Sequence, residues 1–229
     1  LGGEIDPELL RSAIRAYPDV VVAHSHRSHG VQHMSRPPKS DHYYMIVGDL
    51  GQDRAPRRNS PCIMVWEFNP SVGGMDLVYF WWGWERRKTY PVLDSSYWVY
   101  DSGGTQAGTF EVFRSYMGQA AGTDDVFGYP MRMLNVQKET AKKLVIQALN
   151  NKWLRWPEVK ALIAQPSNWN LEMDRDGQPQ DVTMVLFMSV MRGWQILNDP
   201  DTVRNTELGL VRNPYDNFVS IDYPQSKPL

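Results

Sequence analysis

The segment from Asp76 to Trp84 constrains the fold of this chain most strongly, because most of it has no polar face. Side chains alternate between the two faces of a β-strand, and the consecutive residues Leu77–Trp82 are all apolar or aromatic. A strand that is apolar on both faces needs cover on both sides, as a central strand of a sheet has. We therefore expect this strand to lie in the middle of a sheet that other elements cover.

Further β-prone segments predict the rest of this sheet. Tyr43–Val47 and Cys62–Phe68 are apolar runs, and turn-forming residues follow each of them. Shorter segments of the same kind lie at Asp19–Ala23 and Tyr97–Tyr100. We expect a mainly antiparallel sheet over about residues 43–116.

Helical patterns flank the predicted sheet. Asp6 and Pro7 suit the N-cap and the first position of a helix, and apolar residues recur at helical spacing over residues 7–17, 137–155 and 157–165. A late hairpin is expected over residues 170–188, and a polar, proline-spaced tail from about residue 199. Together these elements predict a single α+β domain over residues 1–229.

The composition is that of a globular domain, and it argues against several functional classes. The formal net charge is −2 and the sequence pI is about 6.2, so we expect no nucleic-acid partner. No apolar run approaches the roughly 18–20 residues of a membrane span. The single cysteine, Cys62, excludes an internal disulfide and is compatible with a cytoplasmic protein. The chain begins with Leu1, so we expect that upstream residues were removed, and the localisation stays open.

The histidines are the residues most suited to chemistry. His24, His26, His29 and His33 fall within ten residues after a valine run, and His42 follows. Imidazole is the commonest metal ligand in proteins, and His24 and His26 would share one face of an extended segment. The cluster predicts a metal site made of His24, His26 and His29, for a divalent ion such as zinc. Candidates to complete it are Asp41, His42 and Asp49.

The spacing His24-x-His26-x-x-His29 resembles the first metal motif of the metallo-β-lactamase superfamily. That family has an aspartate directly before its third histidine, where this chain has Ser28, and it needs histidines far downstream, whereas none follows His42. The resemblance covers about ten residues and is not a basis for assigning the chain to that family.

Two other interpretations of the histidine segment stay open. The first is a solvated loop whose imidazoles make ordinary surface hydrogen bonds. The second is an anion-binding or pH-sensitive surface, in which Arg27 and Arg36 act together with protonated histidines. His33 and His42 would be binding residues of such a surface.

Aromatic residues are the second candidate for function. The chain has 9 tryptophans and 11 methionines, and Trp81, Trp82 and Trp84 lie almost side by side. They could form a stacking platform for sugars or bases, a buried aromatic core, or a protein interface. The apolar neighbours of these tryptophans favour the core.

The remaining polar motifs favour structural roles. Cys62 opens an apolar strand, which is typical of a buried structural thiol rather than a nucleophile. Asp174, Asp176 and Asp181 have the trace of a calcium loop, but Gly177 between apolar segments favours a hairpin turn. No nucleophile elbow and no phosphate-binding glycine loop is present.

Two classes of function follow from these observations. The interpretation that we favour from the sequence is a non-catalytic interaction or assembly subunit, with a protein partner or a second copy of itself bound to an aromatic and methionine-rich surface. The alternative is a hydrolase with a site on the loop of His24, His26 and His29, metal-dependent if these imidazoles bind an ion.

Overall fold

The computed structural model describes part of the chain, in segments separated by gaps. The described residues are 4–16, 21–24, 31–34, 43–49, 61–68, 73–83, 87–92, 97–103, 111, 127–171, 180–198 and 217–222. The helices are α1 (Pro7–Arg11), α3 (Asn135–Asn150), α4 (Lys160–Asn168) and α6 (Asp181–Asn198). The strands are β1 (Val21–His24), β2 (Val31–Met34), β3 (Tyr43–Asp49), β4 (Cys62–Phe68), β5 (Met75–Trp82), β6 (Arg87–Val92), β7 (Tyr97–Asp101), β8 (Phe127–Met131), β9 (Leu154–Arg155) and β10 (Asn217–Asp222).

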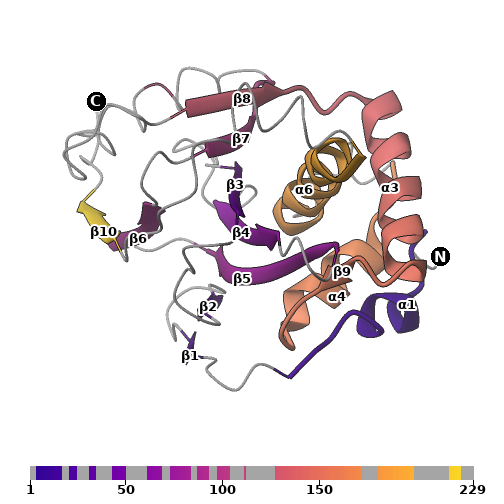
Figure 1. Cartoon of the computed structure of the whole chain (residues 1–229), viewed down its shortest axis with the longest axis horizontal. Helices are drawn as coiled ribbons and strands as arrows, with labels where there is room; N and C mark the ends of the chain where they lie inside the picture. Colours follow the sequence, from indigo (N-terminus) through magenta and orange to yellow (C-terminus); the bar gives the residue numbers. More distant parts are fainter. Residues whose placement is uncertain are drawn as a thin grey trace.

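One mixed sheet organises the described part of the molecule (Figure 1). Its strand order is β1-β2-β5-β4-β3-β7-β8, β9 pairs with β5, and β6 and β10 form a separate two-stranded sheet. The predicted central strand is confirmed: β5 has β2 on one side and β4 on the other, and all but one of its residues are buried. The α+β fold with a sheet in the middle and flanking helices is therefore confirmed.

The sheet is mainly antiparallel, as expected, but part of it is parallel. β1, β2, β5, β4 and β3 pair antiparallel, but β3 pairs parallel to β7, and β7 pairs parallel to β8. Parallel neighbours cannot be joined by a tight hairpin and need a longer crossover connection. As a result, the carboxyl ends of β3 and β7 meet at one end of the sheet.

Helix α6 replaces the predicted late hairpin, so that prediction is wrong. Asp181–Asn198 forms one continuous helix, and every residue from Asp181 to Val190 is buried. A helix buried on all sides has no polar stripe, so its sequence is an apolar run that periodicity alone does not distinguish from a strand. The expected hairpin turn at Asp174–Gly177 lies outside the described residues.

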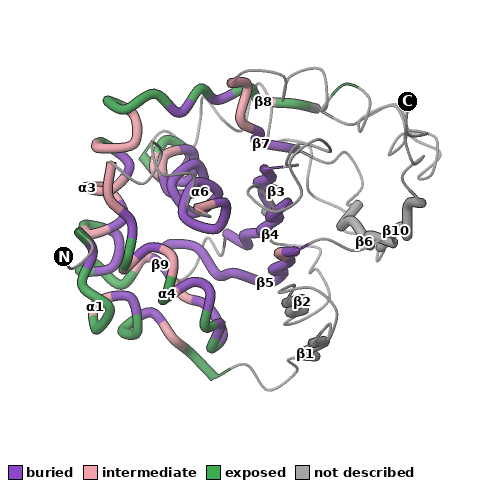
Figure 2. The backbone as a smooth tube through the Cα atoms, turned by 180° about the vertical axis from the view of Figure 1, so that it is seen from behind, coloured by how far each residue is buried: buried purple, intermediate pink, exposed green. Residues whose placement is uncertain are grey.

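Helix α6 lies against β3, β4 and β7 on one side and against α3 and α4 on the other (Figure 1). Its last part closes on the start of β5, because a Cβ at Gly193 would come within 2.2 Å of the Met75 Sδ atom. The residues coloured as buried in Figure 2 fill α6 and the strands β3, β4 and β5, whereas α3 turns an exposed face outward. In the described part of the chain, no helix is long and apolar enough to cross a membrane.

The first predicted helix is much shorter than expected. The Asp6 side chain accepts a hydrogen bond from Glu8 N at 2.9 Å and caps α1, as its sequence predicts. The helix then ends at Arg11, because the following residues pair with the backbone of Trp156: Arg15 N donates to Trp156 O, and Trp156 N donates to Ala13 O. Helices α3 and α4 match the predicted helices 137–155 and 157–165 with shifted bounds.

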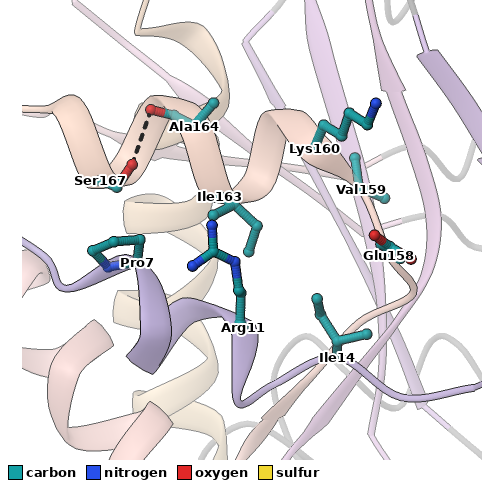
Figure 3. Close-up of a pocket in the computed structure, with 9 residues that line it drawn as sticks. All are labelled: Pro7, Arg11, Ile14, Glu158, Val159, Lys160, Ile163, Ala164 and Ser167. Carbon is teal, nitrogen blue, oxygen red and sulfur yellow. Dashed lines mark hydrogen bonds between the residues drawn. The ribbon is translucent and has the colours of Figure 1, made fainter.

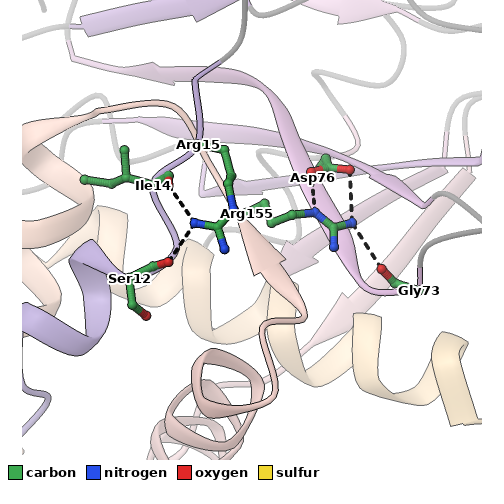
Figure 4. A network of polar contacts seen from close by, with 6 residues as sticks. All are labelled: Ser12, Ile14, Arg15, Gly73, Asp76 and Arg155. Atoms are coloured by element: carbon green, nitrogen blue, oxygen red, sulfur yellow. Dashed lines mark hydrogen bonds and ion pairs between the residues drawn. The ribbon is translucent and has the colours of Figure 1, made fainter.

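An ion pair fixes the end of the sheet where β5 begins. The Arg155 guanidinium donates to both carboxylate oxygens of Asp76, at 2.7 and 3.1 Å, and also to Gly73 O at 3.1 Å (Figure 4). Both side chains are mostly buried, with exposed fractions of 15% and 12%. A two-point arginine–carboxylate contact fixes direction as well as distance, so it holds β9 against the first residues of β5.

Candidate active site at the carboxyl ends of the parallel strands

A polar row crosses one end of the sheet. Cys62 on β4 pairs with Asp49 on β3 and with Trp82 on β5. The parallel ladder pairs Gly48 with Tyr100, so Asp101, the last residue of β7, stands at the level of Asp49. Residues that pair directly across strands have their side chains on the same face. Asp49, Cys62 and Trp82 therefore share a face, with Asp101 next in line.

Helix α6 brings a third carboxylate to this row. Its first residue, Asp181, lies with its Oδ2 atom 3.5 Å from the Trp82 indole nitrogen, which donates to it. Asp181 and Asp49 are both buried, with exposed fractions of 4% and 7%. Asp101 is half-buried, and its Oδ1 atom accepts a hydrogen bond from Gly103 N at 2.8 Å. Three aspartates from three separate elements thus reach one end of the sheet.

The pKa of the Cys62 thiol indicates negative charge at this end of the sheet. Burial raises the pKa of Cys62 well above its ordinary value of 9.0, and the negative charges of Asp181 and Asp49 raise it further. Both carboxylates are therefore close enough to act electrostatically on the same buried sulfur atom. The thiol is fully buried, which confirms the prediction of a buried cysteine, and it stays protonated at neutral pH.

The start of α6 is held from the side of α4. The Gln165 side chain accepts a hydrogen bond from Val182 N at 3.0 Å, and the Trp169 indole nitrogen donates to the Gln180 side chain at 2.9 Å. Backbone N–H groups in the first turn of a helix have no partner within the helix, so Gln165 supplies one from outside. These contacts set where the backbone of Asp181 lies relative to the sheet.

The donor set suits a hard divalent cation. Carboxylate oxygens are the ligands that Mg²⁺ and Mn²⁺ prefer, and a cation would offset the charge of buried aspartates. Among the described residues, no three histidine, cysteine, aspartate or glutamate side chains stand close enough to hold a metal ion together. Mg²⁺ does not require such a group, because it usually takes one or two carboxylates and completes its shell with water and substrate phosphates.

The predicted histidine site falls mostly outside the described residues. His26, Arg27, His29 and His42 lie outside them, as do the further candidates Arg36 and Asp41. The backbones of His24 and His33 are described: His24 ends β1 opposite Val31, and His33 on β2 pairs with Phe80. Val31 in turn pairs with Trp82, so β1 ends at the same end of the sheet as the polar row. The metal site of His24, His26 and His29 stays a prediction.

The tryptophans of the predicted aromatic surface differ in how far they are buried. Trp81 is buried, with an exposed fraction of 2%, and Trp82 is half-buried beside Asp181. Trp84 lies outside the described residues. Trp66, Trp98, Trp156 and Trp169 are completely buried. Most described tryptophans therefore serve the core.

Sequence reasoning named only one carboxylate of this row as a site residue. The sequence indicates Asp49 as a candidate to complete the histidine site and favours a turn for the segment before Asp181, and it gives no local signal for Asp101. A non-local signal is present, because the apolar strands Tyr43–Asp49 and Tyr97–Asp101 both end in aspartate. Two strand-ending aspartates indicate a shared site only if the strands run parallel, whereas the sequence predicts a mainly antiparallel sheet.

A pocket of about 500 Å³ lies elsewhere, between α1 and α4 (Figure 3). Its lining combines apolar side chains such as Ile14 and Ile163 with the charged side chains of Arg11, Glu158 and Lys160. Figure 3 shows the Arg11 guanidinium beside Ile163. None of the three aspartates lines this pocket, so it is separate from the polar row.

Comparison with known proteins identifies the fold through structure and not through sequence. No protein-family model matches the chain, and no curated protein matches it significantly. The structure is similar to the large terminase nuclease of the thermophilic phage G20c in a crystal structure with bound zinc, with a TM-score of 0.52 and 14% identity. The match covers 80% of this chain and 96% of that chain. A second structure of the same nuclease, with bound magnesium, gives a TM-score of 0.50 at 14% identity, over 80% of this chain and 95% of that chain.

These similarities correct two expectations. The interpretation as a non-catalytic interaction subunit is contradicted, because the two solved structures to which this fold is similar are those of a nuclease. The exclusion of nucleic acid, which was based on net charge, conflicts with the same finding. The charge of a whole chain does not determine the local charge at one site, and a metal ion changes that local charge. A protein partner or homo-oligomer stays a prediction.

Proposed function

We propose that this protein is a metal-dependent nuclease, and that Asp49, Asp101 and Asp181 form its active site. The observation that carries the proposal is that these aspartates come from β3, β7 and α6 and meet at one end of a sheet with the fold of a nuclease domain. In open sheets of α/β proteins, ligands bind beyond the carboxyl ends of the strands. This is the end at which Asp49 and Asp101 stand.

The charge of the site supports a cation as part of it. A phosphodiester is an anion, and three aspartates would repel it. When bound, a divalent cation neutralises this repulsion, polarises the phosphoryl oxygen and activates a water molecule for attack. Asp49 and Asp181 are buried close to the same thiol. They would hold such an ion from strand β3 and from helix α6. Asp101, which is more exposed, would complete the site from the side of the substrate.

The protein around the aspartates would keep the site rigid. Asp49 lies on a strand that is paired on both sides, and Asp181 lies on a helix whose first turn is held by Gln165. A catalytic group on a rigid element is positioned more precisely than one on a loop. Catalysis of phosphodiester cleavage depends chiefly on such positioning and on charge stabilisation.

Cleavage of supercoiled plasmid DNA tests the proposal. We expect nicking or linearisation in the presence of Mg²⁺ or Mn²⁺ and none with EDTA. Asp181→Asn should lower the rate by about 100-fold or more, because it removes a charge from the cation site. The matched control is Asp6→Asn, which exchanges the same groups at an exposed helix cap where asparagine also serves. Cleavage by Asp181→Asn at the wild-type rate would overturn the proposal.

A further inference from the structure

The two tryptophan N–H groups that donate to the start of α6 differ from those of Trp66 and Trp156. Trp82 donates to Asp181 and Trp169 donates to Gln180. By contrast, the indole nitrogens of Trp66 and Trp156 are buried without a hydrogen-bond partner among the described residues. Buried indole N–H groups usually find a partner. In this protein, two of the tryptophans that have one converge on the two residues that open the helix of the proposed site.

The contacts at Gln180 and Asp181 have different effects. Trp169, together with Gln165, holds the backbone at the start of α6. These bonds fix where Asp181 stands but leave its side-chain torsions free. The Trp82 indole contacts the carboxylate itself, at Oδ2, and can therefore fix the direction in which the carboxylate points.

The position of Trp82 in the sheet makes its direction specific. Trp82 pairs with Cys62, which pairs with Asp49, so the indole stands at the end of the row that contains two of the groups of the proposed site. A carboxylate drawn toward this row faces Cys62 and Asp49, in agreement with the effect of both aspartates on the Cys62 thiol.

We infer that Trp82 is a positioning residue, whose indole N–H orients the Asp181 carboxylate toward Asp49; its meaning for catalysis rests on the proposed function. Groups that hydrogen-bond a metal-binding carboxylate from behind set its orientation, and their loss typically lowers metal affinity or activity 10- to 100-fold. A donor–acceptor distance of 3.5 Å is long, and hydrogen bonds of this kind commonly shorten when an active site binds its ligands.

The indole N–H resonances of ¹⁵N-labelled protein test the contact without any assay of activity. The 9 tryptophans give 9 such resonances. That of Trp82 is identified by its loss in Trp82→Phe, or by contacts to its neighbours in the chain if this variant does not fold. We expect Asp181→Asn to shift the Trp82 resonance and to leave that of Trp156 in place. An unchanged Trp82 resonance would overturn the inference, whether or not the protein cleaves DNA.

The metal dependence of cleavage tests the positioning role. Trp82→Phe keeps a ring and removes the N–H, and we expect it to raise the Mg²⁺ or Mn²⁺ concentration for half-maximal rate by about tenfold or more. The matched control is Trp156→Phe, whose indole nitrogen has no hydrogen-bond partner among the described residues. The smaller ring should lower the melting temperature without changing the metal requirement. An unchanged metal requirement in Trp82→Phe would overturn the role. Failure of the wild type to cleave DNA would count against the proposed function, and the resonance test would still stand.

Discussion

The two ends of the strands β4 and β5 both carry buried carboxylates, and the groups around them differ. Where β5 begins, Asp76 is held by the Arg155 guanidinium, and Glu67 on β4 accepts a hydrogen bond from the Tyr44 hydroxyl at 2.8 Å. Where β5 ends, Asp49 and Asp181 flank a protonated thiol, and the indole N–H of Trp82 approaches Asp181.

The comparison contrasts a structural use of buried charge with the functional use that we propose. At the Asp76 end, a cation of the protein itself offsets the buried charge, and its bonds tie β9 to β5. At the Asp49 end, carboxylates from three elements lie at the same end of the sheet, and Asp49 and Asp181 both raise the pKa of the Cys62 thiol. Functional sites commonly retain arrangements that stability alone would not favour. The predictions below test whether the two ends differ in this way.

The largest expected effect is a contrast between Asp49→Asn, which should impair cleavage, and Asp76→Asn, which should impair stability. Asp49→Asn should lower cleavage by about 100-fold or more, because it removes a carboxylate of the proposed site. Asp76→Asn should cost about 2 kcal/mol of stability, because it leaves Arg155 with a weaker partner. Cleavage rates at saturating metal and urea unfolding measure the two effects. Equal loss of activity in both variants would remove the distinction.

A second contrast lies in the turn before β5, at the end with the ion pair. Gly74 has a φ of +79°, and an added Cβ would lie 2.3 Å from the backbone oxygen of Trp153. We expect Gly74→Ala to destabilise the protein by about 2–4 kcal/mol, with normal cleavage per folded molecule.

The control is Gly73→Ala at the neighbouring position. Gly73 also has a positive φ, of +68°, but an added Cβ there meets nothing within 4 Å. Gly73→Ala should lower the free energy of unfolding by only about 1 kcal/mol, from backbone strain alone. Equal costs at the two positions in chemical denaturation would show that the contact with Trp153 is not tight.

A third contrast is the pH dependence of stability at the Asp49 end. The pKa of Cys62 is raised above 9.0 in the folded protein, so the folded state keeps a proton that the unfolded state releases. The resulting stability is complete below about pH 9 and is lost as the pH rises through the folded pKa, by up to about 1.4 kcal/mol per pH unit.

The variant Cys62→Ala lacks this titrating group. Urea unfolding in EDTA from pH 7 to 10 should show that the wild type loses stability more steeply than Cys62→Ala above about pH 9. Parallel curves for the two proteins would mean that neither burial nor the charges of Asp181 and Asp49 act on the thiol as the structure indicates.

The parts of the fold that could be predicted are those in which local sequence and burial agree. β5 is apolar on both faces and lies inside the sheet, between β2 and β4, as its residues predict. α3 has an exposed side, and helical spacing reveals it. α6 has no exposed side over its first ten residues, so its pattern is the same as that of a buried strand.

The candidate site could not be predicted from the sequence for a related reason. Asp49 and Asp101 meet because β3 and β7 are parallel, and that pairing depends on a crossover between strands more than forty residues apart. Asp181 joins them from a helix 80 residues after Asp101. The histidines, by contrast, are close together in the sequence, and for that reason the sequence predicts a site there. A catalytic site assembled from single residues on separate elements leaves no such density in a sequence.

The smallest expected effect concerns these histidines, which are predicted from the sequence to form a second metal site with different chemistry. Imidazole favours zinc, whereas carboxylates favour magnesium, so the two predicted metal sites can be tested separately. Replacement of His24, His26 and His29 together by alanine should abolish any stoichiometric zinc found by elemental analysis. The same variant should change the magnesium-dependent cleavage rate by less than about threefold, because the carboxylate row supplies the Mg²⁺ ligands. The control is Asp49→Asn, which should show the reverse pattern. Loss of magnesium-dependent cleavage in the histidine variant would mean that the strand β1, which ends beside the row, contributes to the same site.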